Sequence, residues 1–235
     1  MSSSSDDALL MLDWSYRLSD FLLFSPRVYW RMFELHNAAL GPLPLAMLAL
    51  GIAMFAVIIL RPHRSGRLIA ILLAVLWAWV GWSFVWERYA TINWAAAYAA
   101  PLFAIEALLL LVVGGIAKRL SFDERGARRA LGLLLIALAL AYPLLAPLFG
   151  RPWRAAEFFG MAPDPTAIGT LGFLVMARGK SVLPLYLVPV LWCLMSGLAL
   201  WAMEDAQAWM LALALTLLGL ALALGDARGV ARTEP

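Results

Sequence analysis

Long apolar stretches alternate with short polar and charged segments along this chain. A helix needs about 20 mostly apolar residues to cross a membrane, with a range of about 17–25. The pattern therefore predicts an all-α protein, a polytopic transmembrane helical bundle. Six stretches are long enough to cross, and they cover residues 43–60, 67–86, 95–117, 130–149, 181–203 and 206–225.

A seventh stretch, 166–177, is apolar but has only 12 residues. It follows Pro163-Asp164-Pro165, in which Asp164 is placed to cap a helix and Pro165 suits the first helical position. At a rise of about 1.5 Å per residue the stretch is too short to cross alone. Two alternatives follow: a seventh span extended to Lys180, with its basic side chains snorkelling, or a re-entrant segment beside six spans.

The loop charges distinguish these alternatives, because lysine and arginine accumulate in cytoplasmic loops. With seven spans and the N-terminus outside, 12 basic residues lie inside and 6 outside. With a re-entrant segment, Arg178, Lys180, Arg228 and Arg232 change sides, and the split becomes 8 inside against 10 outside. We therefore expect about seven spans in the cell (inner) membrane, with the N-terminus outside and the C-terminus cytoplasmic.

The chain divides into three predicted parts. Residues 1–42 form an extracytoplasmic, interfacial segment, in which Ser25-Pro26 marks a helix start. Aromatic and charged residues mix over 28–35, which fits a helix lying along the lipid headgroups or one packed on the protein's own outer loops. Residues 43–225 form the transmembrane domain, and 226–235 form a cytoplasmic tail. The first residues have no basic n-region, so we expect no signal peptide.

Composition excludes several classes of protein. The chain of 235 residues is 64% hydrophobic and 14% charged, whereas a soluble domain is about 45–50% apolar and about 25% charged. A single cysteine, Cys193, excludes an internal disulfide and a cysteine-built cluster. His36 and His63 lie outside the longest apolar runs, so a bis-histidine haem buried between helices is excluded. Neither lysine lies within a span, which excludes a retinal Schiff base. We expect no cofactor, no metal site and no nucleic-acid partner.

Tryptophans gather near the predicted outer ends of the spans. This is typical of the aromatic belt at a membrane surface, and the alternative is an aromatic-walled pocket. The side chains concerned are Trp82, Trp86, Trp94, Trp153, Trp201 and Trp209, together with Tyr89.

Glu106 lies in the middle of the third predicted span. An ionised carboxyl facing lipid there costs several kcal/mol, so we expect it to be protonated, paired or facing a wet cavity. Three roles are open for Glu106: it carries protons or ions, it joins helices through a hydrogen bond, or it contacts a partner subunit. Its candidate partners are Tyr142, Thr166 and Thr170, and Thr170 is the second predicted functional residue of the interior.

Polar residues also gather in the predicted outer loops. Arg88, Asn93, Arg151 and Asp164 form a candidate outer-face cluster, as ion pairs or as the site of an enzyme that acts on a lipid. No nucleophile–histidine pairing, metal-ligand spacing or glycine-rich phosphate loop is present, so no catalytic residue is assigned.

Several runs resemble one protein family. They are Tyr16-Arg-Leu-Ser-Asp-Phe-Leu-Leu-Phe-Ser-Pro26, Glu87-Arg-Tyr-Ala-Thr-Ile-Asn-Trp94, Gly150-Arg-Pro-Trp153, Phe159-Gly-Met-Ala-Pro-Asp-Pro-Thr-Ala-Ile-Gly169 and Trp192-Cys-Leu-Met-Ser-Gly197. Together they resemble a bacterial family of multi-pass membrane proteins classed as a domain of unknown function, over most of residues 14–225. Some members of such families are labelled permease-like, and the resemblance supplies no catalytic residue.

Three functional hypotheses follow. The leading one is a small permease-like or channel-like protein whose path passes Glu106 and the segment 166–177. The second is an accessory or structural subunit of a membrane complex, with another membrane protein or a second copy of the chain as partner. The third is an intramembrane enzyme that acts on lipid, although the sequence favours no enzymatic activity.

Overall fold

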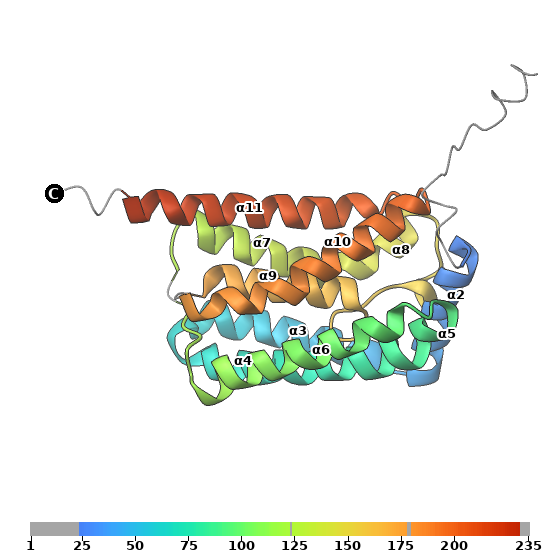
Figure 1. Ribbon diagram of the computed structural model, residues 1–235, viewed down its shortest axis with the longest axis horizontal. Coiled ribbons are helices and arrows are strands. Elements are labelled where there is room, and N and C mark those ends of the chain that lie inside the picture. Colours follow the sequence, from blue (N-terminus) through green and yellow to red (C-terminus); the bar gives the residue numbers. More distant parts are fainter. Residues whose placement is uncertain (1–23, 123, 178–179, 231–235) are drawn as a thin grey trace, which may run out of the picture.

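The computed structural model describes residues 24–122, 124–177 and 180–230. Within these ranges the chain is helical and has no β-strand, which confirms the predicted all-α class. Residues 1–23 and 231–235, which include the start of the predicted interfacial segment and the end of the predicted tail, lie outside the described residues. The helices lie side by side in an elongated bundle (Figure 1).

The helices follow one another in a simple order. In sequence they are α2 (Pro26–Leu40), α3 (Leu43–Leu60), α4 (Pro62–Val80), the π-helical η2 (Gly81–Tyr89), α5 (Ala90–Ile92), α6 (Ala96–Leu110), the π-helical η3 (Leu111–Ile116), α7 (Ala127–Ala141), the 3₁₀ turn η4 (Tyr142–Leu144), α8 (Leu145–Leu148), the 3₁₀ turn η5 (Trp153–Ala155), α9 (Pro163–Met176), the 3₁₀ segment η6 (Lys180–Tyr186), α10 (Leu187–Ala202) and α11 (Ala208–Val230).

Five continuous helical segments are long and apolar enough to cross a membrane, which indicates a membrane-embedded protein. They are Leu43–Leu60, Pro62–Ile92, Ala96–Ile116, Ala127–Leu148 and Ser181–Ala202, close to five of the predicted spans. The second begins at Pro62 rather than at residue 67, because proline suits the first turn of a helix and the exposed Arg64 and Arg67 point away from the bundle.

The sixth predicted span, 206–225, is α11. The apolar part that the structure describes, Ala208–Leu224, is shorter than the other five. The helix itself continues to Val230, which is part of the predicted tail.

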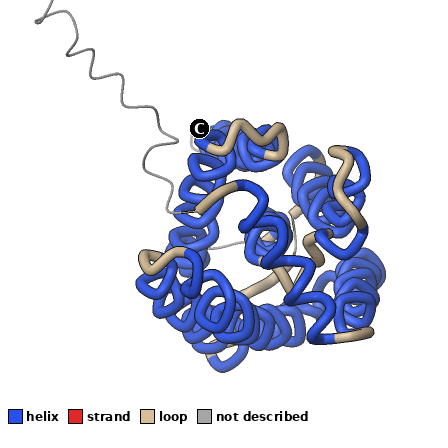
Figure 2. Tube along the Cα trace, turned by 90° about the vertical axis from the view of Figure 1, so that its right-hand side faces the viewer, coloured by secondary structure: helices blue, strands red, loops and turns tan. Residues whose placement is uncertain are grey.

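The short segment 166–177 lies in α9, and this helix occupies the centre of the bundle. Every residue from Pro163 to Met176 is buried, and Figure 2 shows the bundle end-on, with a helix enclosed by the others. A helix that is apolar all round has no face suited to water, so it is stable only when neighbours surround it. Contacts with α4, α7, α10 and α11 provide that enclosure.

Glycines permit the closest of these contacts. A Cβ atom at Gly172 would lie 2.8 Å from the Gly132 carbonyl oxygen and 2.7 Å from Ile136 Cγ1, so α7 and α9 approach almost backbone to backbone. Small residues allow such packing between membrane helices.

The chain changes ends of the bundle on its way through α9. It leaves α8 at the end where α2 lies, and α10 begins at the opposite end (Figure 1). The residues just before α9, 156–162, are irregular and fully buried. The backbone therefore passes from one end of the bundle to the other between α8 and α10.

The two ends differ in charge. Basic residues at or near the α2 end are Arg27, Arg31, Arg88, Arg151 and Arg154. Those at or near the other end are Arg61, Arg64, Arg67, Lys118, Arg119, Arg125, Arg128 and Arg129.

The helix predicted to begin at Ser25-Pro26 is α2, and its cap is confirmed: the Val28 amide donates to Ser25 Oγ at 3.4 Å. The helix lies across one end of the bundle (Figure 1). Its buried face packs on the protein, with Phe33 4.7 Å from Phe84 between ring centroids. Asn37 also donates to the carbonyl oxygens of Arg154 and Ala156 at 2.9 and 2.8 Å. This is the alternative in which the helix packs on the protein's own loops.

Candidate functional site

Asp164 is the centre of a buried polar site near the α2 end of the bundle. Its side chain is 1% exposed and accepts three hydrogen bonds. Trp192 Nε1 donates to Oδ1 at 2.7 Å, and Ser196 Oγ donates to Oδ2 at 2.9 Å. Tyr142 OH donates to Oδ2 at 3.3 Å. These donors come from α10 and η4, and they offset part of the free-energy cost of burying the carboxyl group.

The start of α9 explains why Asp164 is free to bind these donors. The N-cap is Ala162 and makes no side-chain capping bond, so the prediction that Asp164 caps this helix is wrong. Asp164 lies in the first turn instead. Thr166 Oγ1 accepts from the Gly160 amide at 2.9 Å and donates to the Ala162 carbonyl at 2.7 Å, which fixes the turn.

A second buried carboxyl, Glu157, lies in the irregular segment before α9. It is 3% exposed, and Gln207 Nε2 donates to its Oε1. Its Oε2 has no hydrogen-bond partner among the described residues. Burial raises the pKa of Glu157 well above its ordinary range, and the nearby charge of Asp164 raises it further. Glu157 and Asp164 are therefore an interacting pair of acids that holds a proton readily.

Arg151 connects this pair to the surface. Its Nη1 lies 2.9 Å from Asp205 Oδ2, and its Nη2 donates to Gln207 Oε1. The guanidinium carbon lies 3.5 Å from the centroid of the Trp30 ring, a cation–π contact. Gln207 thus bridges Arg151 and Glu157 through the two ends of its amide.

A cavity of about 140 Å³ lies directly beside the Asp164 donors. Trp192 and Ser196 form part of its wall, and Tyr29, Tyr89 and Asn93 line it from α2, η2 and the loop after α5. Its size suits a few water molecules or a small ion, because drug-sized ligands occupy about 300–1,000 Å³.

A chain of contacting aromatic rings begins at Trp192 in the wall of this cavity. The Trp192 ring lies 5.0 Å from Phe103, and Phe103 lies 4.6 Å from Trp77, both between ring centroids. Trp77 Nε1 then donates to Thr170 Oγ1 at 2.9 Å. Thr170 Oγ1 itself donates to the Thr166 carbonyl at 2.8 Å, so this predicted functional residue is bound to its neighbours in the structure.

Glu106 lies on α6, on the same buried helix face as Phe103 and Leu110. It is 0% exposed, so neither lipid nor bulk water reaches it. Both carboxyl oxygens lack a hydrogen-bond partner in the described part of the chain.

The hydrogen bonds predicted between Glu106 and other side chains are absent from the described structure. Tyr142 donates to Asp164. Thr166 and Thr170 each donate to a backbone carbonyl of their own segment, at Ala162 and Thr166. Each of the three hydroxyl groups therefore donates its hydrogen bond to an acceptor other than Glu106.

The predicted outer-face cluster is divided between two cavities. Asn93 lines the cavity beside the Asp164 donors, and Arg151 reaches the acid pair through Gln207. Arg88 lines a different and larger cavity with residues of α2. The sequence placed Glu157 with Arg151 and Asp164 in a candidate outer-face ion-pair cluster. It gave Trp192, Ser196 and Gln207 no role at this site, because residues this far apart in the sequence meet only in the folded bundle.

A comparison with protein families identifies the chain. The model of a family of unknown function, DUF6064, matches residues 26–233. The chain belongs to this family. The DUF6064 match includes every residue of the Asp164 site and of both cavities, and it confirms the expected membership of a family of unknown function. No curated protein matches. No solved structure matches.

Proposed function

We propose that this DUF6064 protein is a small permease-like membrane protein that moves a proton past Asp164. The observation that carries the proposal is a fully buried carboxyl, held by three donors, beside a cavity at one end of the bundle. An ionisable group inside a membrane bundle is costly, and such groups commonly mark ion and proton pathways.

The backbone around Asp164 supports the same proposal. Irregular backbone at membrane depth is tolerated only inside protein or along a cavity, and residues 156–162 are irregular and buried. Transporters commonly build their sites from discontinuous helices whose ends meet near the middle of the membrane. The short α9 likewise begins directly after an irregular buried segment, although it does so at the α2 end of the bundle.

The path would run from the cavity to Asp164 and then to Glu106. The aromatic contacts of Phe103 with Trp192 and Trp77 separate these two acids. Passage therefore requires these rings to move, which favours a permease with alternating access over an open channel.

The proposed placement has seven crossings, with the α2 end outside and the opposite end, where α11 finishes, cytoplasmic. It is supported by the larger number of basic residues at that opposite end, because cytoplasmic loops carry an excess of lysine and arginine. The cell membrane remains the expected location.

Two other hypotheses have less support. An enzyme acting on lipid would need the four outer-face residues around one site, but Arg88 lines a separate cavity. An accessory subunit would show no flux when purified alone.

The test is proton movement in liposomes that contain only the purified chain. A pH-sensitive dye inside the vesicles reports acidification driven by a potassium diffusion potential. We expect wild-type protein to exceed protein-free vesicles, and Asp164→Asn to lower the rate about 100-fold or to background. Glu87→Gln is the matched control, because it makes the same chemical change at an exposed carboxyl near the same end. No flux in wild type, or equal loss in both variants, contradicts the proposal.

A further inference from the structure

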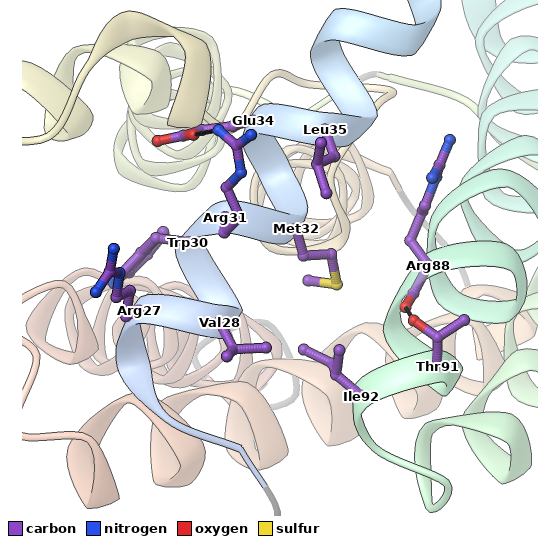
Figure 3. A pocket seen from close by; sticks show the side chains of 10 residues that line it. All are labelled: Arg27, Val28, Trp30, Arg31, Met32, Glu34, Leu35, Arg88, Thr91 and Ile92. Carbon is purple, nitrogen blue, oxygen red and sulfur yellow. Dashed lines mark hydrogen bonds and ion pairs between the residues drawn. The ribbon is translucent and has the colours of Figure 1, made fainter.

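A second cavity, of about 620 Å³, lies between α2 and the end of η2 with α5 (Figure 3). Three arginines line it: Arg27 and Arg31 from α2, and Arg88 from η2. We call this the arginine cavity. It is distinct from the cavity at Asp164, and the inference below does not depend on proton movement.

Two of the three arginines carry uncompensated charge in the described structure. Arg31 pairs with Glu34, one turn further along α2. Arg27 and Arg88 form no ion pair with any residue that the structure describes, and Figure 3 places them on opposite sides of the cavity. Guanidinium groups bind phosphate well, because their planar donors match its oxygens.

Apolar side chains lie between the two charges. Val28 and Leu35 are 43% and 48% exposed, and Met32 and Ile92 also line the cavity (Figure 3). A free phosphate ion would use only the arginines. An amphiphile would use the arginines and the apolar side chains together.

The position of the cavity matches the level of lipid headgroups. Helix α2 lies across the end of the bundle (Figure 1), where exposed tryptophans also gather, namely Trp82, Trp86, Trp94, Trp153, Trp201 and Trp209. Tryptophan side chains concentrate at the boundary between membrane and water.

We propose that the arginine cavity binds an anionic phospholipid. Arg88 binds the phosphate group, Arg27 attracts the same negative charge from the opposite side of the cavity, and Val28 and Leu35 contact the glycerol and the first part of the acyl chains. The bound lipid joins α2 to the end of η2, two elements that meet only at this end of the bundle.

The test uses the full chain purified in a non-ionic detergent, with lipid binding measured by native mass spectrometry. We expect wild-type protein to retain dioleoyl phosphatidylglycerol in preference to dioleoyl phosphatidylcholine. The double variant Arg27→Gln/Arg88→Gln should weaken phosphatidylglycerol binding about fivefold for each arginine, or about 25-fold in total. The control Arg61→Gln/Arg64→Gln removes two exposed arginines at the opposite end and should leave binding within about twofold.

Competition distinguishes a lipid from a free phosphate. We expect millimolar inorganic phosphate and the deacylated headgroup glycerophosphoglycerol to displace little bound lipid, and Leu35→Asn to weaken binding although it changes no charge. The proposal is overturned if wild-type protein shows no preference for phosphatidylglycerol. It is also overturned if the two double variants behave alike, or if inorganic phosphate competes as well as the lipid does.

Discussion

At the scale of single residues, three buried carboxyl groups differ in the donors that reach them. Asp164 accepts from three side chains, Glu157 accepts from one, and Glu106 has no partner among the described residues. An unpaired buried polar group costs free energy that a paired one partly recovers. Glu106 therefore lacks the contacts that a purely structural role would provide.

Glu106→Gln should separate a proton-carrying role from a structural one. Glutamine has almost the same shape and no titratable proton, and no hydrogen bond to a described residue is lost. We expect the free energy of unfolding to change by less than about 1 kcal/mol, while dye-reported proton flux falls to the level of protein-free vesicles. A large loss of stability in an SDS titration, with flux retained, would support the structural role instead.

Glu157→Gln should change how stability depends on pH. The pKa of Glu157 in the fold is raised above its ordinary value of 4.5, so the folded state binds the proton more tightly than the unfolded chain does. The stabilisation by this proton is complete below about pH 4.5 and is lost as pH rises through the raised folded pKa. Relative to wild type, the variant should therefore become progressively more stable above about pH 4.5.

The measurement is the melting temperature of both proteins in detergent from pH 4 to pH 9. Glu87→Gln, at an exposed residue of η2 for which no ion pair with a described residue is found, is the control and should track wild type. A constant difference between wild type and Glu157→Gln across this range would contradict the assignment.

At the scale of elements, length and hydropathy located the helices but not their surroundings. The predicted span 43–60 coincides with α3, because an apolar stretch of this length needs no tertiary contact to be recognised. The segment 166–177 is ambiguous on length alone. In the structure this segment packs against α7, and Gly132 and Gly172 permit the close contact. The two helices are distant in the sequence, so local hydropathy does not reveal their contact.

Gly172→Ala tests whether this contact holds α9 in the centre. The new Cβ would lie within 2.8 Å of Ile136 and of the Gly132 carbonyl, so the two helices must separate. We expect a destabilisation of about 1–3 kcal/mol, measured by denaturant titration in mixed micelles. Gly219→Ala is the control: its Cβ meets nothing within 4 Å, so the substitution should be neutral or slightly stabilising. Equal effects at the two positions would refute the close-contact interpretation.

At the scale of the whole molecule, the two ends of the bundle differ in charge and in aromatic content. The α2 end carries the exposed tryptophans and both cavities, and the opposite end carries most of the arginines. In the proposed orientation, with the α2 end outside, the proposed proton path opens on the outer side and the proposed lipid site lies there too.

Single cysteines report this orientation directly. Cys193 is buried, and Cys193→Ala gives a background without cysteine for Arg154→Cys, Arg119→Cys and Ser181→Cys. A membrane-impermeant maleimide should label the position at 154 from outside intact cells, and those at 119 and 181 only after lysis. Labelling at 181 from the same side as 154 would mean that the chain does not cross through α9.

The sequence by itself determined the all-α class of this protein, the approximate bounds of its long helices and the positions of its basic residues between the apolar stretches. These properties follow from local hydropathy and from charge, which act residue by residue along the chain. Only the tertiary structure decided that Asp164 binds Trp192, Ser196 and Tyr142, that Gln207 binds Glu157, and that Arg88 belongs to another cavity. Hydrogen bonds and cavities of this kind depend on which helix faces meet, and that choice is made by packing across the whole bundle.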